Sequence, residues 1–317
     1  MSIHKHESIF VAGHRGLVGS ALLRRLQADG YDNVLTRPSS ELDLRNQEAV
    51  DRFFADHRPA LVVLAAARVG GIHANSSYPA QFICDNLQIQ CNVIDAAYRH
   101  GARKLLFLGS SCIYPKFAPQ PIQESSLLTS PLESTNEWYA IAKIAGLKMC
   151  QAYRQQYGFN AIAAMPTNLY GPNDNFDLQN AHVLPALIHR VHEARTQGDS
   201  KFVVWGTGEP RREFLHVDDL ADACLFLLDS YDSGDLVNVG WGEDVSIREL
   251  AQLIGTIVGF EGDIVFDATK PDGTPRKLLD VSKMAALGWK PRVPLLEGVR
   301  STYEWFVANQ DRALRRP

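Results

Sequence analysis

The sequence predicts an α/β protein with a doubly wound parallel sheet and a smaller α/β lobe toward the C-terminus. As far as Pro172, short apolar runs alternate with stretches of helix formers. One run, at residues 61–67, is almost wholly apolar, as expected for a parallel strand that is covered on both faces. Strands that alternate with helices of this length are typical of a doubly wound sheet.

A glycine-rich turn follows the first predicted strand. The apolar residues 8–12 precede the turn, and residues 20–26 after it are expected to form a helix. Glycines between a strand and a helix let the backbone approach a pyrophosphate, whose charge the helix N-terminus favours. We therefore expect a Rossmann-type dinucleotide site that comprises Gly13, Arg15, Gly16, Leu17, Val18 and Gly19. The spacing is G-x-x-G-x-x-G, and the lack of a following G-K-[ST] excludes a P-loop; a plain turn is the structural alternative.

The end of the second predicted strand, at residues 33–37, indicates which dinucleotide binds. An acidic residue at this position selects NAD by binding the adenosine ribose. Residues 36–40 contain no carboxylate, and Arg37, Ser39 and nearby Arg15 suit a 2′-phosphate. We therefore expect NADP(H), although Glu41 lies close by and Arg37 could instead be a solvated charge.

The alternation continues through the rest of the first domain. We expect helices at residues 46–57, 79–100 and 136–157 and strands at residues 61–67, 104–110 and 160–166. The small side chains of residues 65–67 could pass close under the cofactor. Residues 68–72 turn away from the sheet, where Gly70 and Gly71 allow close approach to a bound sugar or simply form a loop.

The residues with the clearest chemistry lie between Leu108 and Lys143. Tyr139 and Lys143 are four residues apart in a run of helix formers, so the phenol and the ammonium should share one face. A fixed cation beside a tyrosine favours the phenolate, so Tyr139 could exchange a proton with a substrate oxygen. Ser110 ends a predicted strand, where ligands bind in open α/β sheets, and its hydroxyl could hold the same oxygen. The Y-x-x-x-K spacing alone is also compatible with a packed Tyr and a solvated Lys.

Beyond Gly171 the chain becomes polar and rich in turns, and a second lobe is expected to begin. A helix at 182–197 and a strand at 202–206 belong to this lobe, and a helix at 218–230 returns to the first. Ser246 and Glu249 have the spacing of a capping box. A strand near 265–267, a loop at 270–277 and two helices complete the lobe. We assign residues 1–172 and about 214–240 to the dinucleotide-binding domain, and residues 173–213 and 241–317 to the smaller lobe.

The composition argues against several classes of protein. A formal net charge of −4 and dispersed Lys and Arg residues provide no basic field for nucleic acid. No apolar run approaches the roughly 18 residues that a membrane span needs, and the start lacks a signal-peptide apolar region. The cysteines are odd in number and lack C-x-x-C spacing, which argues against a disulfide framework or a metal site. We therefore expect a cytoplasmic protein.

Together, the glycine turn, Ser110, Tyr139 and Lys143 resemble the extended short-chain dehydrogenase/reductase family. Four further motifs extend the resemblance over nearly the whole chain, at residues 109–115, 136–143, 166–172 and 270–277. They are similar to the family members that act on GDP-4-keto-6-deoxy-D-mannose. The resemblance implies that this sugar is inverted at C3 and C5 and then reduced at C4 by NADPH. It also implies a homodimer, formed through the helices at 79–100 and 136–157.

The resemblance also implies roles for individual residues. The C4 ketone acidifies the hydrogens on both neighbouring carbons, so inversion needs a base and an acid in addition to Ser110, Tyr139 and Lys143. The motif match implies that Cys112 and His182 supply them, although a lone Cys is usually a small buried residue and a lone His at a helix start usually lies on the surface. Further implied cofactor contacts are Leu108, Lys143, Pro166, Asn168, Leu169 and His182, and implied substrate contacts are Arg190, Trp205, Arg212 and Asp272.

One implied contact and one departure from the family pattern bear on these assignments. The Arg212 guanidinium could bind two phosphate oxygens, or it could form an ion pair with Glu209 or Glu213. Trp138 stands where the family pattern often has Pro, which affects the start of the helix that carries Tyr139.

Two other interpretations remain open. A nucleotide-sugar 4-epimerase or 4,6-dehydratase would share the sheet, the glycine turn, the Tyr and the Lys. Dehydratases typically carry an Asp-Glu pair where this chain has Ser111 and Cys112, and both classes usually retain NAD. A non-catalytic sensor could bind a dinucleotide on the same fold, but such proteins typically lose the Tyr or the Lys, and both are present here.

Overall fold

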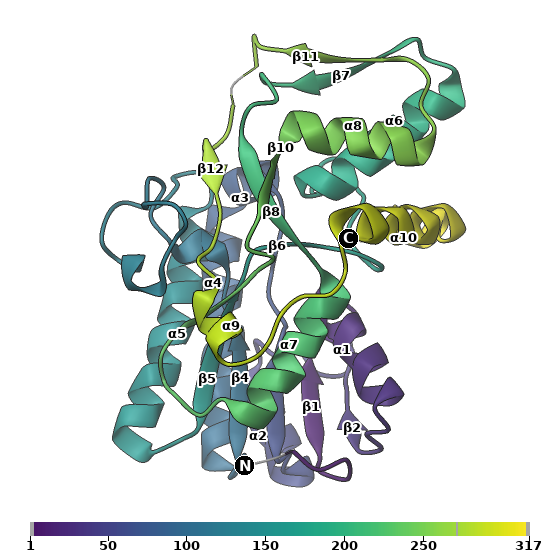
Figure 1. Cartoon of the computed structure of the whole chain (residues 1–317). Helices are drawn as coiled ribbons and strands as arrows, with labels where there is room; N and C mark the ends of the chain where they lie inside the picture. Colours follow the sequence, from purple (N-terminus) through teal and green to yellow (C-terminus); the bar gives the residue numbers. More distant parts are fainter. Residues whose placement is uncertain (1–2, 271, 315–317) are drawn as a thin grey trace.

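A six-stranded parallel sheet forms the centre of the larger part of the molecule (Figure 1). The computed structural model describes residues 3–270 and 272–314; Met1, Ser2 and Pro271, which belong to the N-terminal tail and to the motif at 270–277, lie outside the described residues. The strand order is β2 (Val34–Leu35), β1 (Ile9–Ala12), β3 (Leu61–Leu64), β4 (Lys104–Leu108), β5 (Ala161–Pro166) and β9 (Val237–Val239). Each neighbouring pair is parallel, which confirms the predicted fold class.

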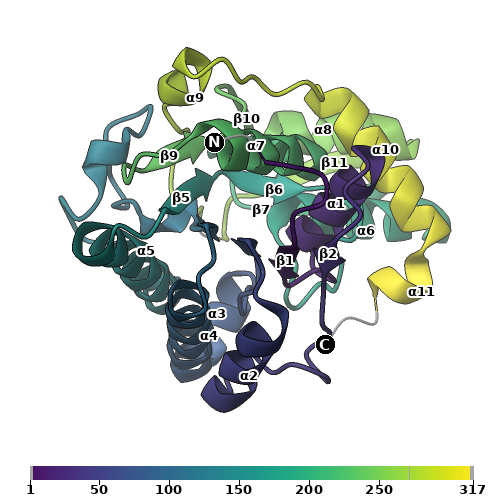
Figure 2. The same ribbon diagram turned by 90° about the horizontal axis from the view of Figure 1, so that it is seen from below.

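Helices cover both faces of this sheet, as Figure 2 shows from below. One face carries α1 (Leu17–Ala28) and α7 (Val217–Ser230), and the other carries α2 (Gln47–His57), α4 (Pro79–Arg99) and α5 (Glu137–Tyr157). The short α3 (Ile72–Ser77) leads into α4. None of the helices in the described part of the chain is long and apolar enough to span a bilayer.

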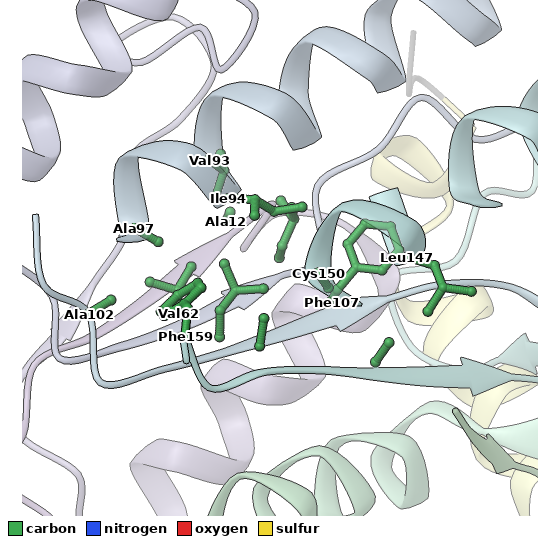
Figure 3. Packing of buried hydrophobic residues seen from close by; sticks show 14 of the residues in the cluster. Ala12, Val62, Val93, Ile94, Ala97, Ala102, Phe107, Leu147, Cys150 and Phe159 are labelled. Carbon is green, nitrogen blue, oxygen red and sulfur yellow. The ribbon is translucent and has the colours of Figure 1, made fainter. Parts of the chain in front are cut away.

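The strands are almost wholly apolar, with Lys104 in β4 and Asn238 in β9 as exceptions, because each side chain meets a helix layer, whichever way it points. In β1, Phe10 and Ala12 pack toward α2 and α4, whereas Ile9 and Val11 pack toward α1 and α7. Figure 3 shows the first of these cores, where Val62 and Phe107 from the sheet meet Val93, Ile94 and Leu147 from the helices. Successive residues of a strand point to opposite faces, so covering both faces removes the usual alternation with polar residues.

A separate core lies above the carboxyl ends of the sheet (Figure 1). Its helices are α6 (Val183–Gln197), α8 (Ile247–Val258) and α10 (Leu295–Ala308). β8 (Arg211–His216) pairs with β10 (Asp244–Ser246), β12 (Arg276–Lys277) and β6 (Asn168–Tyr170), and β7 (Lys201–Trp205) pairs with β11 (Asp263–Asp267). Short helices complete the chain: η1 (Ser111–Ile113), η2 (Glu124–Ser126), α9 (Ser282–Ala286) and α11 (Gln310–Ala313).

Several local expectations can be compared with this architecture. The capping box is confirmed, since the Ser246 hydroxyl accepts from the Glu249 N–H at 3.1 Å and the Glu249 carboxylate accepts from the Ser246 N–H at 2.7 Å. The second strand is shorter than predicted, with only Val34–Leu35 paired, and three helices rather than two follow the loop at 270–277. The domain boundaries given above remain a proposal.

The glycine turn after β1 is built by close backbone packing. Gly13 has a φ of 87°, which favours glycine, and a Cβ there would lie 2.7 Å from the Ala66 nitrogen. A Cβ at Gly19 would lie 2.2 Å from the Gly13 carbonyl oxygen. By contrast, a Cβ at Gly16 would lie 3.4 Å from that same oxygen, which is an ordinary contact.

We predict that Gly19→Ala destabilises the fold and that Gly16→Ala, as a matched control, does so far less. The Gly19 methyl must displace rigid backbone, and overpacking of this kind costs about 1–3 kcal/mol. The Gly16 change only replaces a tolerated cap residue, at a cost below about 1 kcal/mol. Urea unfolding without cofactor measures both values. Equal losses of stability in the two variants would contradict this account of the turn.

Candidate active site

The candidate catalytic residues gather beyond the carboxyl end of β4. Ser110 caps the short helix η1, and its hydroxyl oxygen accepts from the Cys112 N–H at 3.2 Å. Tyr139 lies in the first turn of α5, buried against Phe82, whose ring it meets edge-on at 6.5 Å between centroids. Ser110 also hydrogen-bonds to the phenol of Tyr139. The structure thus brings Ser110, Cys112 and Tyr139 into one cluster.

Burial, rather than Lys143, dominates the acidity of Tyr139. Removal from water raises the pKa of Tyr139, the charge of Cys112 raises it further, and the hydrogen bond from Ser110 opposes both effects. The expectation that Lys143 makes the phenolate favourable is therefore wrong for this structure. At neutral pH the phenol keeps its proton, which is the state required of an acid that protonates a substrate oxygen.

Lys143 is directed toward the sheet instead of toward the phenol oxygen. Its ammonium donates to the Leu108 carbonyl at 2.8 Å and lies 5.0 Å from the centroid of the Phe107 ring. It lies 5.8 Å from the Tyr139 ring centroid, over the ring. Burial lowers the pKa of Lys143 to about 8, so at pH 7 most of the molecules carry the charge.

Cys112 receives two hydrogen bonds at its sulfur. Asn136 Nδ2 donates at 3.4 Å from the position just before α5, and Lys277 Nζ donates at 3.5 Å from β12. The oxygen of the same side-chain amide, Asn136 Oδ1, is buried without a hydrogen-bond partner among the described residues. A substrate hydroxyl is the type of donor that would satisfy it.

His182 enters the same region from the second lobe. It is the N-cap residue of α6, and its side chain keeps access to solvent. The protein packed around the ring lowers the pKa of His182, and the positive charge of Lys277 lowers it further. The imidazole is therefore neutral at pH 7. Lys277 thus acts electrostatically on His182 while it also contacts Cys112.

The loop at residues 68–72 lies against the chain that leads into His182. Gly71 packs against the chain just before His182: its N–H donates to the Asn180 carbonyl at 2.9 Å, and a Cβ at Gly71 would lie 2.8 Å from the Ala181 carbonyl oxygen. The small residue is thus required by protein backbone, which is the structural alternative to contact with a sugar.

The residues around the glycine turn fit a dinucleotide. The first turn of α1 has no side-chain cap at Gly16 and no acidic residue, so its N–H groups can receive a pyrophosphate. Arg37 is not a solvated charge: its guanidinium donates to the Thr36 carbonyl at 2.7 Å, bonds His57 at 3.0 Å and lies over the Phe53 ring. Arg15 and Ser39, the other two residues expected to bind a 2′-phosphate, are exposed.

The other predicted cofactor contacts lie along the ends of the strands. Leu108 and Pro166 end β4 and β5, and Asn168 and Leu169 lie in β6. Asn168 Nδ2 donates to the Glu213 carbonyl at 2.8 Å, which fixes β6 against β8.

The predicted substrate residues gather around the end of β7. Trp205 is 66% exposed, with the Arg190 guanidinium 6.0 Å from its ring centroid. Asp272 accepts hydrogen bonds from the Thr207 N–H at 3.0 Å and from the Thr207 hydroxyl at 2.7 Å, which anchors the 270–277 loop beside β7. An exposed ring flanked by charged side chains can stack on a base.

In the described structure Arg212 does not pair with Glu209 or Glu213, which were the alternative to phosphate binding. Its guanidinium donates to the Arg211 carbonyl at 2.8 Å. Glu209 pairs instead with Arg248, and Glu213 accepts backbone N–H groups. Burial lowers the pKa of Arg212, and the charge of Glu133 opposes that effect.

Sequence reasoning missed two residues that contact Cys112. Asn136 and Lys277 both lie within motifs used for the family resemblance, but nothing in the sequence relates either to position 112. Among the described side chains, which do not include that of His73, no group of three or more His, Cys, Asp or Glu could hold a metal ion.

Comparisons with known proteins agree over almost the entire chain. The model of the NAD dependent epimerase/dehydratase family matches residues 9–240. GDP-L-fucose synthase 1 of Arabidopsis thaliana is 64% identical over 305 residues, covering 96% of this chain and 94% of that protein. The GDP-L-fucose synthase of Escherichia coli (strain K12) is 53% identical over 315 residues, covering 96% and 98%.

A solved structure supports the same relationship. A GDP-L-fucose synthetase from Naegleria fowleri bound to NADP has a TM-score of 0.91 and 29% sequence identity, covering 99% of this chain and 98% of that one. These findings confirm the family resemblance predicted from the motifs. The chain belongs to the NAD dependent epimerase/dehydratase family.

Proposed function

We propose that this chain catalyses the GDP-L-fucose synthase reaction, in which GDP-4-keto-6-deoxy-D-mannose is inverted at C3 and C5 and reduced at C4. The observation that carries the proposal is the placement of Cys112 beside Ser110 and Tyr139, with Lys277 in contact with its sulfur and close enough to lower the pKa of His182. An ordinary ketoreductase needs Ser110 and Tyr139 but neither Cys112 nor His182. The identity to relatives named GDP-L-fucose synthase supports the same choice.

Reduction at C4 uses the groups beyond β4. Bound NADP(H) supplies the hydride. Ser110 holds the C4 oxygen, and Tyr139, protonated at neutral pH, gives its proton to that oxygen. Lys143, through its hydrogen bond to the Leu108 carbonyl, holds the helix that carries Tyr139 against the end of β4.

Inversion uses the same ketone before it is reduced. The Cys112 thiolate removes a proton from C3 or C5, an S–H bond forms, and the electron pair of the C–H bond moves into an enolate on the C4 oxygen. His182 takes up a proton from solvent, returns it as the imidazolium to the opposite face of the same carbon, and the ketone re-forms. Ser110 and Tyr139 stabilise the enolate oxygen through hydrogen bonds.

NADP(H) is the dinucleotide that fits the ribose end of the cradle. Arg15, Arg37 and Ser39 present two guanidinium groups and a hydroxyl, and residues 36–40 contain no carboxylate. Arg37 reaches this place supported by Phe53 and His57, so little side-chain freedom has to be lost when phosphate binds. The NADP-bound relative supports this choice.

A homodimer formed through α4 and α5 completes the proposal. These helices pack on each other, and their outer faces carry the partly exposed apolar residues Ile83, Leu87, Ile141 and Ala145 next to Trp138, which is 44% exposed. A second copy would cover this apolar strip. Cys84 and Cys91 are exposed free thiols on α4, which favours a reducing compartment such as the cytoplasm.

Tyr139→Phe should abolish most of the reduction while leaving NADPH binding intact. The variant keeps the buried ring but loses the proton donor, and loss of one general acid lowers the rate by a factor of about 10² to 10⁴. Tyr157→Phe, near the exposed end of the same helix, is the matched control and should reduce substrate normally. The measurement is nicotinamide absorbance with the 4-keto sugar. Unchanged turnover in Tyr139→Phe would refute the assignment.

Arg15→Ala combined with Arg37→Ala should remove the preference for NADPH over NADH. A hydrogen bond to a charged group contributes about 1.5–3 kcal/mol, so NADPH should bind at least about tenfold more weakly while NADH is little affected. Arg52→Ala, on the exposed face of α2, controls for the loss of surface charge. Fluorescence titration of both dinucleotides gives the dissociation constants. A preference that survives the double change places the 2′-phosphate elsewhere.

The double variant Cys112→Ala, His182→Asn should lose exchange at C3 and C5 before it loses reduction at C4. In deuterated water without NADPH, the wild type should wash deuterium into both positions, because enolisation needs the ketone and a base but no hydride. Cys112→Ala alone should suppress the exchange, and His182→Asn alone should give products that are not inverted at both carbons. NMR of the sugar distinguishes these results. Wild-type exchange in the double variant would assign both residues to packing.

A further inference from the structure

Lys277 connects the second lobe to the sulfur of Cys112. It lies in β12, whose parallel partner β8 holds it opposite Arg212. From that strand the ammonium comes within 3.5 Å of Cys112 Sγ, which lies in η1 beyond β4. Cys112, Asn136 and Lys277 line one small pocket, together with charged residues from both lobes.

The other charged groups of this pocket are engaged elsewhere. Lys116 pairs with Glu133 at 2.9 Å, and Thr274 donates to the same carboxylate at 3.3 Å. Arg276, beside Lys277 in the strand, pairs with Asp244. The remaining neighbours of the sulfur are Asn136, which is neutral, and Tyr139, which keeps its proton at neutral pH. Among the described groups that line the pocket, Lys277 is therefore the cation in contact with the sulfur.

We infer that Lys277 is a positioning residue for inversion: its ammonium, in contact with the Cys112 sulfur, stabilises the thiolate form of that residue and makes the protonated form of His182 a better proton donor. The inference rests on the proposed function and adds to it a group that controls when the base is ready. Lys277 acts through Cys112 and His182 and need not touch the carbon that is inverted.

The positive charge of Lys277 favours the deprotonated form of both Cys112 and His182. A cation stabilises a thiolate that accepts its N–H and disfavours a second positive charge on a nearby imidazole. The lowering of the His182 pKa by Lys277 is the visible part of this effect. When the thiolate takes the sugar proton it becomes a neutral thiol, and the attraction to Lys277 weakens. Lys277 thus favours loss of the thiol proton to solvent, while His182 takes up another proton from solvent, and both groups are ready for inversion at the second carbon.

Alkylation of Cys112 tests the inference without any sugar. The probe is iodoacetamide, and mass spectrometry of the peptide that contains Cys112 gives its rate at pH 7 and at pH 9. A short unstructured peptide with one cysteine, in the same vessel, is the reference thiol. In the wild type the rate at Cys112 should rise less between the two pH values than the reference rate does. An equal or steeper rise overturns the inference, and this comparison needs no variant.

Substitutions at position 277 provide the second arm. Lys277→Met removes the charge but keeps a similar side-chain length. The alkylation rate at pH 7 should fall about tenfold, because loss of an adjacent opposite charge lowers the fraction of thiolate by about that factor or more. Lys277→Arg should restore the wild-type pH dependence. Lys290→Met, which removes an exposed lysine beyond α9, is the charge control and should behave as the wild type. A Lys277→Met profile identical to the wild-type profile overturns the inference.

Exchange of C3 and C5 hydrogens separates failure of this inference from failure of the proposed function. In Lys277→Met the exchange should be slow at pH 7 and should recover toward the wild-type rate at pH 9, which damage to the fold would not do. Equal slowing at both pH values would overturn the role of the charge. If the wild type exchanges neither hydrogen at either pH, the proposed function is wrong, while the alkylation result still decides whether Lys277 controls the sulfur.

Discussion

The candidate site depends first on the buried ammonium of Lys143. A charge of this kind is costly to bury unless a polar partner receives its N–H groups. The Leu108 carbonyl, the last residue of β4, is that partner at 2.8 Å. This bond ties the catalytic helix α5 to the carboxyl end of the central strand. It thereby fixes Tyr139, one turn earlier in α5, against Ser110, two residues beyond β4.

A second buried group holds the upper half of the site. Glu213 in β8 is fully buried, and its carboxylate accepts the N–H groups of Gly242 at 2.7 Å and Leu279 at 3.1 Å. Burial raises the pKa of Glu213, and these hydrogen bonds oppose the rise. The carboxylate thus joins β8 to two other segments, the one that contains Gly242 and the one that follows Lys277. This connection holds β12 beside β8, and so it fixes Lys277 opposite Arg212.

The sequence predicts the sheet and the catalytic helix well because their signals are local. Apolar runs report burial on both faces, and the spacing of Tyr139 and Lys143 reports a shared helix face. Short elements such as β6 and β12 carry no such signal, since they form only when β8 is present to pair with them. The acidity of Tyr139 was mispredicted for a related reason. Spacing places a cation near the ring, but only the fold determines that the ammonium turns to Leu108 and that the phenol is buried.

The two chemistries of the site make opposite demands on protonation, and the structure meets them by giving each group its own surroundings. Tyr139 is buried away from donors other than Ser110 and keeps its proton, whereas Cys112 faces the N–H groups of Asn136 and Lys277. The two are also coupled, because negative charge on Cys112 raises the pKa of Tyr139. As long as the thiolate is present, Tyr139 therefore gives up its proton less readily. This coupling favours inversion over reduction while the base is ready, and so it opposes reduction of a sugar that has not yet been inverted.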